Sequence, residues 1–301
     1  MSLLRLIRFP NLLIVALTQY LLYNRIILPA LDAQQIQPTL LSNPFYLFIL
    51  VTILITAGGY IINDITDVKI DLLNKPKQVI VGRKISLATA YWLYFCFNLM
   101  GFIFALYLAL VGNRMALLFI FPVAVVGLLA YSVFLKKRPL SGNILVSLYC
   151  AGVALIVWIA EQPAIVQLPA PTLTRVTQLF TYYAVFAFFS TLFREIIKDL
   201  EDAPGDAAAG ASTIPVAWGT GVAKRIAGAA AGVLLLYLLY FFYALFSQIS
   251  LAGNIALGIL IFFIGVALLL LLRAKEIYQY HRLSQLTKWI MLAGILLLFI
   301  F

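Results

Sequence analysis

The acidic side chains of this chain are concentrated in two short segments that share one spacing. Of the 11 Asp and Glu residues, eight lie in "NDITDVKID" (63–71) and "REIIKDLEDAPGD" (194–206). Each segment contains the pattern D-x-x-D-x-x-x-D, and every position of the second pattern follows the first by the same offset. The residues of the two patterns are Asp64, Asp67 and Asp71, and Asp199, Asp202 and Asp206.

The spacing predicts that each triplet forms a stripe of carboxylates. On a helix, positions i, i+3 and i+7 project from one face, so three negative charges lie side by side. Carboxylates this close repel one another, and a cation between them removes that cost. Mg²⁺ binds carboxylate oxygens and completes its shell with water and phosphate oxygens. We therefore predict that the six aspartates bind two Mg²⁺ ions and that Asn63 offers an amide oxygen to the first.

A second interpretation is that these are solvated loop acids that balance neighbouring lysines. One cluster alone fits that interpretation as well as it fits a metal site. Two clusters with the same internal spacing, each following an apolar run, favour the metal site. They also indicate an internal duplication within a single membrane-embedded domain (1–301), with pseudo-repeat halves of about 1–135 and 136–301.

The rest of the chain is strongly apolar. Of its 301 residues, 64% are hydrophobic and 11% are charged, and the mean hydropathy of +1.05 excludes a soluble globular domain. A helix of about 20 residues crosses the roughly 30 Å hydrocarbon core, and the apolar runs are too continuous for barrel strands. We predict an all-α polytopic membrane protein whose nine spans are 11–31, 44–63, 88–111, 115–135, 142–161, 176–194, 223–246, 251–272 and 284–301.

The cations are unequally distributed between the two ends of these spans. With the N terminus inside, all Lys and Arg residues except Arg25, Arg114 and Arg175 lie on the inner side. The positive-inside rule then places the N terminus and both acidic segments in the cytoplasm. Because this asymmetry accounts for the net charge of +10, the charge requires no nucleic-acid partner, and membrane lipids are the expected surroundings.

Basic residues accompany the acids on this inner side. They suit phosphate groups, because Arg offers a planar fork of donors and Lys a point charge. Metal ions together with Lys and Arg side chains on one face are typical of a diphosphate-binding site. The candidate phosphate-binding residues are Lys75, Lys77, Arg83, Lys136, Arg138, Arg194 and Lys198. Membrane topology alone also explains each of these cations except Lys75 and Arg83, which lie closest to the first acidic segment.

These segments resemble the UbiA superfamily of intramembrane prenyltransferases. "NDITDVKIDLLNKP" matches the N-D-x-x-D-x-x-x-D motif of that family, and "KDLEDAPGD" is similar to its second aspartate-rich motif. The nine spans, the opening "RFPN" with Asn11, and "GRKIS" at 82–86 extend the likeness over essentially the whole chain. The segment "KPKQVIVGRKIS" departs from the R-x-R-P-L-x-S-G pattern of many members, so the acceptor stays open at this point.

The resemblance implies a helical bundle around a central cavity, with a cytoplasmic cap over two Mg²⁺ ions that bind a prenyl diphosphate. It implies a Mg²⁺-dependent transferase that ionises the diphosphate and attaches the prenyl group to a lipophilic acceptor. Within the family, "FREIIKDLEDAPGD" is similar to the ether-lipid branch. That branch attaches a geranylgeranyl group to the glycerol hydroxyl of geranylgeranylglyceryl phosphate.

Further residues then acquire expected roles in this reaction. Asn11 would orient the acceptor, and Lys136 and Arg138 are available for its phosphate. The rings of Tyr131 and Tyr149, chosen by their depth in the spans, would stabilise an allyl cation. Packing alone also explains each aromatic residue of such an apolar chain.

Two expectations concern local structure near the second acidic segment. Pro204 and Gly205 are predicted to break the helix there, so that Asp206 can fold over the site. The single histidine, His281, is expected at the surface of the last inner loop.

Three other functions share part of this pattern. An aromatic-acceptor prenyltransferase of quinone or haem biosynthesis would share the diphosphate site and differ in its acceptor pocket. A cation-coupled membrane transporter also uses repeats and paired acids, but its acids are expected near span centres. A non-catalytic scaffold has no use for matched carboxylate stripes. A bacterial or archaeal cell membrane is the expected location, and the sequence sets neither prenyl chain length nor oligomeric state.

Overall fold

The computed structural model describes residues 2–74, 79–112, 114–247 and 249–300, and within these ranges the chain is helical almost throughout. An isolated bridge joins Val81 and Ile85. The helical elements are α1 (Ser2–Leu6), α2 (Phe9–Leu21), the π-helical η1 (Leu22–Ile27), α3 (Leu28–Asp32), α4 (Ser42–Asn74), α5 (Leu87–Val111), α6 (Met115–Leu118), α7 (Ile120–Val133), η2 (Leu135–Lys137), α8 (Ser141–Ile165), α9 (Ala170–Ala208), α10 (Ile214–Trp218), α11 (Thr220–Leu245), α12 (Leu251–Arg273), α13 (Ile277–Leu296) and η3 (Leu297–Phe299).

Counting only the described residues, nine helical stretches are long and apolar enough to cross a bilayer. They are Phe9–Asp32, Asn43–Val68, Leu87–Val111, Ile120–Lys137, Ser141–Ile165, Ala170–Ala208, Thr220–Leu245, Leu251–Arg273 and Ile277–Phe299. Each overlaps one predicted span, so the all-α prediction with nine membrane helices is confirmed. The fourth begins at Ile120 rather than at 115, because Met115–Leu118 forms the separate short helix α6.

Polar residues define where two of the helices start. The Ser86 hydroxyl accepts a hydrogen bond from the Thr89 N–H at the start of α5. Helix α13 begins with a capping box, in which the Glu276 and Gln279 side chains each accept a backbone N–H of the other residue. Such caps satisfy N–H groups that have no partner inside the first turn.

The chain divides into two compact units, which are described separately. Unit 1 contains Met1–Tyr20, Leu31–Lys136 and Ile156–Leu168, and unit 2 contains Leu21–Ala30, Lys137–Leu155 and Pro169–Phe301. Because unit 1 takes in Ile156–Leu168 and unit 2 takes in Leu21–Ala30, the units do not coincide with the predicted halves, and the pseudo-repeat stays a prediction. The first acidic segment belongs to unit 1 and the second to unit 2.

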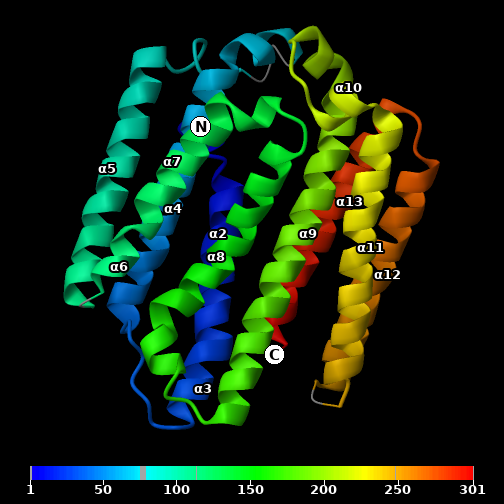
Figure 1. Cartoon of the computed structure of the whole chain (residues 1–301). Coiled ribbons are helices and arrows are strands. Elements are labelled where there is room, and N and C mark those ends of the chain that lie inside the picture. The colour runs from blue at the N-terminus through cyan, green and yellow to red at the C-terminus, as the bar shows by residue number, and fades with distance from the viewer. Residues whose placement is uncertain (1, 75–78, 113, 248, 301) are drawn as a thin grey trace. The chain divides into compact units, whose positions relative to one another are not determined.

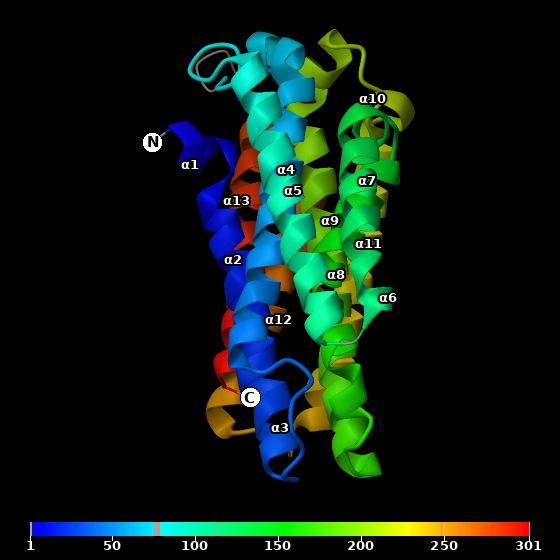
Figure 2. The ribbon, with the colours of Figure 1, turned by 90° about the vertical axis from the view of Figure 1, so that its left-hand side faces the viewer.

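In unit 1, helix α4 packs along α5 and α7 (Figure 1), and Figure 2 shows α5 beside α4 from a second direction. Two glycines permit this approach. A Cβ added at Gly58 would lie 2.6 Å from Asn98 Nδ2 on α5, and one at Gly59 would lie 2.9 Å from a Leu128 methyl on α7. Near the first acidic segment, an apolar cluster joins α1, α4, the turn at 80–85 and α5. Its buried members are Leu6, Ile61, Ile62, Ile65, Val81 and Ala90.

In unit 2, helix α9 packs against α11 and α13, and α12 packs against α11 and α13 (Figure 1). Small side chains on α11 allow close packing of membrane helices. Helix α13 meets α9 at Gly294, where an added Cβ would lie 2.2 Å from the Phe186 ring. This contact holds α13 in one rotation relative to α9 and so determines which polar side chains of the two helices meet. The buried alanines of α11 are Ala223, Ala227, Ala230 and Ala231.

Candidate active site

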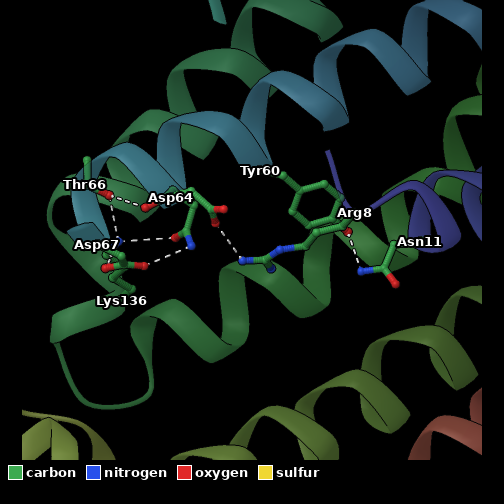
Figure 3. A network of polar contacts seen from close by, with 8 residues as sticks. Arg8, Asn11, Tyr60, Asp64, Thr66, Asp67 and Lys136 are labelled. Carbon is green, nitrogen blue, oxygen red and sulfur yellow. Dashed lines mark hydrogen bonds and ion pairs between the residues drawn. The ribbon is translucent and has the colours of Figure 1, made fainter. Parts of the chain in front are cut away.

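The first acidic segment lies on a continuous helix. Because α4 extends to Asn74, its last turns hold Asp64 and Asp67 in place rather than leaving them in a loop. Asp64 Oδ1 lies 3.2 Å from Arg8 Nη2, and Asp67 Oδ1 lies 2.6 Å from Lys136 Nζ (Figure 3). Each carboxylate is therefore paired with a cation from another segment of unit 1.

Lys136 is the centre of this network. Its ammonium group also donates hydrogen bonds to Thr66 Oγ1 at 2.8 Å and to Asn63 Oδ1 at 3.3 Å. The Asn63 amide in turn donates to Asp67 Oδ2 at 3.0 Å. The side chains of Lys136 and Asp67 are only 11% and 18% exposed, so the pair is shielded from solvent and its geometry is well defined.

Arg8 is a site residue that reasoning from the sequence misses. Charge topology explains it only as one of the inner cations, although it begins the "RFPN" segment that contains Asn11. Its guanidinium lies over the Tyr60 ring at 4.8 Å from the centroid, and Asn11 Nδ2 donates to Tyr60 Oη at 3.3 Å (Figure 3). Burial lowers the pKa of Arg8, but the negative charge of Asp64 and its hydrogen bond to the guanidinium outweigh this effect and raise the pKa above its usual value.

The other residues predicted in unit 1 lie around this network. Asp71 is half-buried on the last turns of α4, and Tyr131 is half-buried on α7. Arg83 is exposed in a tight turn that Gly82 makes possible by adopting a φ of 82°. The predicted residues Lys75 and Lys77 lie outside the described residues.

The second acidic segment also lies within a long helix. Helix α9 runs through Pro204 to Ala208, so the predicted break at Pro204 and Gly205 is wrong. Proline removes one backbone hydrogen bond, but buried residues on the preceding turns, including Ile197 and Leu200, hold the helix in place. Asp206 therefore remains on the helix and does not fold over as a loop.

Polar side chains on neighbouring segments of unit 2 orient the second set of aspartates. Asn143 Nδ2 of α8 donates to Asp199 Oδ2 at 2.8 Å, and Thr213 Oγ1 donates to Asp206 Oδ2 at 3.1 Å. Asp202 is half-buried on the same helix. The sequence predicts neither Asn143 nor Thr213, because nothing in its spacing links them to α9.

The remaining predicted residues of unit 2 are dispersed. Arg194 forms an ion pair with the adjacent Glu195, and Lys198 is half-buried one turn later. Tyr149 is half-buried on α8, and Arg138 is exposed. The structure thus groups Arg194 and Lys198 with the second acidic segment on α9, whereas Tyr149 and Arg138 belong to other segments of the unit.

The single histidine has a partner that the sequence does not predict. His281 is 57% exposed, which agrees with the predicted surface position, but it lies on helix α13 and not in a loop, and its Nδ1 lies 2.7 Å from Glu201 Oε1. Glu201 belongs to the second acidic segment. The start of α13 is therefore linked to α9 at that segment.

The donor chemistry of both sets fits Mg²⁺. Among the described residues, no three His, Cys, Asp or Glu side chains stand close enough together to form a metal cage. However, carboxylate and amide oxygens are the hard donors that Mg²⁺ prefers. Asp64 and Asp67 each have a positive group within ion-pair distance, which shows that a positive charge is accommodated beside them. Mg²⁺ binding by the six aspartates stays a prediction.

Sequence comparison gives a family and two relatives with a functional name. Residues 27–300 match the model of the UbiA prenyltransferase family. A protein of Methanopyrus kandleri named digeranylgeranylglyceryl phosphate synthase is 38% identical over 177 residues, which cover 59% of this chain and 59% of that protein. The protein of the same name from Sulfolobus acidocaldarius is 31% identical over 220 residues, covering 73% of this chain and 74% of that one. The alignment thus spans less than two thirds of the Methanopyrus protein.

Solved structures share the fold. A structure of digeranylgeranylglyceryl phosphate synthase has a TM-score of 0.70 at 21% identity, covering 99% of this chain and 96% of that chain. A UbiA homolog from Archaeoglobus fulgidus, bound to GPP and Mg²⁺, has a TM-score of 0.58 at 16% identity and covers 99% of both chains. At these identities the structures support the fold alone, and the family match supplies the assignment. The chain belongs to the UbiA prenyltransferase family.

Proposed function

We propose that this membrane prenyltransferase transfers a geranylgeranyl group from geranylgeranyl diphosphate to the glycerol hydroxyl of geranylgeranylglyceryl phosphate. The observation that carries the proposal is the pair of aspartate-rich helix ends, on α4 and α9, each oriented by polar partners of its own unit. The acceptor is supported by the two relatives named digeranylgeranylglyceryl phosphate synthase.

The six aspartates are the proposed metal ligands. We assign one Mg²⁺ to Asp64, Asp67 and Asp71, and a second to Asp199, Asp202 and Asp206. Magnesium, when bound, supplies Lewis-acid stabilisation of the charge that develops on the diphosphate. The Archaeoglobus fulgidus homolog that binds GPP together with Mg²⁺ supports this use of the metal.

The chain's own residues then have defined tasks. The C1–O bond of the prenyl diphosphate breaks, and its electron pair leaves with the diphosphate, next to the cationic side chains of Lys136 and Arg83. The acceptor hydroxyl oxygen forms the new C–O bond, and its proton passes to a carboxylate. We assign Asn11, whose Nδ2 donates to Tyr60 Oη, to the orientation of the acceptor. Enclosure by membrane helices excludes water, which would otherwise consume the allyl cation.

We also propose that the N terminus and the active site face the cytoplasm. Arg8, directly before α2, and Lys136, shortly after α7, lie at the helix ends that the positive-inside rule assigns to that side. The measurement is cysteine labelling of intact cells at Lys84, an exposed residue of the turn at 80–85. The variant Lys84→Cys should react with a membrane-impermeant maleimide only after the membrane is opened, and labelling of intact cells would place the site outside.

A product assay tests the reaction. Purified protein is incubated with labelled geranylgeranyl diphosphate and Mg²⁺, in parallel with geranylgeranylglyceryl phosphate, hydroxybenzoate and naphthoate as acceptors. We expect an ether product with the glycerophosphate only, and a loss of about 100-fold or more in Asp67→Asn. Asp32→Asn, which changes an exposed acid outside both acidic segments, is the matched control. Product with the aromatic acceptors would instead mean that the protein is a prenyltransferase of quinone or haem biosynthesis. Ion flux in liposomes without product would mean that it is a transporter.

A further inference from the structure

The chain turns sharply at the end of α9, directly after the last aspartate of the second set. The Gly210 N–H donates to Ala207 O at 3.1 Å, and the Ala211 N–H donates to Asp206 O at 2.9 Å. Gly210 has a φ of 70°. Together these features form a Schellman motif, which satisfies the last carbonyl groups of a helix. The backbone of Asp206 is therefore bound by the residues that follow α9.

The same turn brings a hydroxyl to the side chain of Asp206. Thr213 Oγ1 donates to Asp206 Oδ2 at 3.1 Å. On a continuous helix, positions seven residues apart are separated by about 10 Å along the axis, so the contact depends on the turn at Gly210. Thr213 is 6% exposed, and the adjacent Ile214 belongs to the buried apolar cluster of unit 2. Burial therefore holds this hydroxyl in one place.

Thr213 is also the N-cap residue of α10, which packs against α9 (Figure 1). A threonine at this position usually accepts a backbone N–H of the first turn with its hydroxyl. The Thr213 backbone carbonyl does accept the Ala217 N–H at 2.8 Å, but its side chain forms no cap hydrogen bond. Pro215, in the first turn of α10, has no N–H to offer. The hydroxyl thus serves Asp206 rather than the helix that Thr213 begins.

This hydrogen bond is not needed to hold the segment between α9 and α10. The Ser212 N–H donates to Lys137 O at 3.0 Å, and Ile214 is completely buried. The Schellman bonds fix the start of the segment. A role in placing the carboxylate therefore explains the Thr213 hydroxyl better than a role in holding the turn.

We propose that Thr213 is a positioning residue that orients the Asp206 carboxylate for Mg²⁺. This inference rests on the function proposed above, in which Asp206 is a metal ligand. Hydrogen bonds to metal-binding carboxylates fix their orientation and so raise the affinity for the ion. The Thr213 hydroxyl is neutral, so it restricts rotation of the carboxylate without cancelling the negative charge that attracts the cation.

Metal binding without turnover tests this role. The Kd of Mn²⁺, which substitutes for Mg²⁺, is measured on purified protein without substrate, from the EPR signal of the free ion. All variants carry Asp67→Asn as a common parent, so that the second aspartate set dominates the binding. We expect Thr213→Val, which removes the hydroxyl but keeps the branched shape, to raise Kd about tenfold. Thr213→Ser keeps the hydroxyl and should stay within about twofold of the parent.

Two further measurements separate the orientation of Asp206 from a loss of folding. Ser212→Ala removes the exposed hydroxyl next to Thr213 but keeps the backbone N–H, and should leave Kd unchanged. Thr213→Val should melt within about 3 °C of its parent, because water can replace the donor to the half-buried Asp206. Without Asp67→Asn, Thr213→Val should raise the Mg²⁺ concentration for half-maximal rate about tenfold and keep kcat at saturating Mg²⁺ within about twofold.

The turn at Gly210 provides an independent test. At its φ of 70°, asparagine is tolerated and a β-branched residue is strongly disfavoured. Gly210→Val should therefore displace Thr213 and raise the Mn²⁺ Kd as much as Thr213→Val does, whereas Gly210→Asn should have little effect. Because both changes act through one hydrogen bond, Gly210→Val combined with Thr213→Val should raise Kd no further than either alone.

The outcomes that overturn the proposal are distinct from those that overturn the function. If the wild type forms the ether product but Thr213→Val keeps the Mn²⁺ Kd of its parent, with or without a lower Tm, the positioning role is wrong and the function stands. An equal rise of Kd in Ser212→Ala would also refute it. If the Asp67→Asn parent binds no Mn²⁺, the second set is not a metal site of its own and the proposal fails. If Mn²⁺ binding follows the expected pattern but no glycerophosphate product forms, the positioning role stands and the proposed function fails.

Discussion

Lys136 Nζ lies 2.6 Å from Asp67 Oδ1, and both side chains are largely buried. The two residues are far apart in the sequence, one in η2 after α7 and the other on α4, and the same ammonium group also holds Thr66 and Asn63. A buried carboxylate without a positive partner is strongly destabilising. Lys136 therefore supports the first aspartate set structurally, in addition to the role proposed for it at the diphosphate.

Removing this cation should destabilise the protein in a way that Mg²⁺ reverses. We expect Lys136→Met to lower Tm by about 5 °C, because the partly buried Asp67 carboxylate is left unsatisfied at a cost of about 1–3 kcal/mol. Added Mg²⁺ should raise the Tm of this variant more than that of the wild type. Thermal unfolding in detergent with and without MgCl₂ measures both effects. The exposed neighbour Lys137 is the control, and equal losses in Lys137→Met and Lys136→Met would contradict a specific role for the pair.

Asn143 should control the metal requirement of the second aspartate set. Its amide donates to Asp199, and residues that orient metal ligands typically affect affinity or activity about 10- to 100-fold. We expect Asn143→Ala to raise the Mg²⁺ concentration for half-maximal rate about tenfold, measured by titrating MgCl₂ at saturating substrates. Ile144→Ala changes an exposed neighbour on the same helix and should have the wild-type curve. A lower kcat with an unchanged Mg²⁺ curve would show that Asn143 acts elsewhere.

Lysine should not replace Arg8 without a loss of activity. Its guanidinium pairs with Asp64 and lies over the Tyr60 ring, and a lysine ammonium reproduces the charge but not the planar contact. We therefore expect Arg8→Lys to lower kcat/KM about tenfold and Arg8→Met to lower it further, measured in the product assay. Arg5→Lys, at an exposed position three residues earlier, should be neutral. Full activity in Arg8→Lys would mean that only the charge matters.

The close contact between α9 and α13 should be intolerant of a single methyl group. A Cβ at Gly294 would lie 2.2 Å from the buried Phe186 ring, so Gly294→Ala forces one helix to move. Overpacking of this kind costs about 1–3 kcal/mol, and we expect a lower Tm. Phe186→Leu should recover part of the loss in the double variant. Gly258→Ala, where an added Cβ meets nothing within 4 Å, should keep the wild-type Tm, and an equal loss there would contradict the steric explanation.

Much of the candidate site is predictable from the amino-acid sequence. Most of the site residues that could not be predicted share one property, which is that their partners are distant in the sequence. Asp64 and Asp67 stand out because helical spacing and the scarcity of acids are local properties of a sequence. Arg8 and Asn143 do not, because their partners are distant in the sequence and only packing brings them together. The predicted break at Pro204 was wrong because the burial of neighbouring turns of α9 overrides local propensity.

The sequence by itself determined the nine apolar spans, the helical class and the two aspartate patterns, because hydropathy and periodicity act over a few neighbouring residues. The tertiary structure alone decided that Lys136 pairs with Asp67 and that Asn143 donates a hydrogen bond to Asp199. Those pairings depend on the rotation of each helix about its axis. That rotation is set by contacts such as Gly294 against Phe186, which join residues that no local pattern connects.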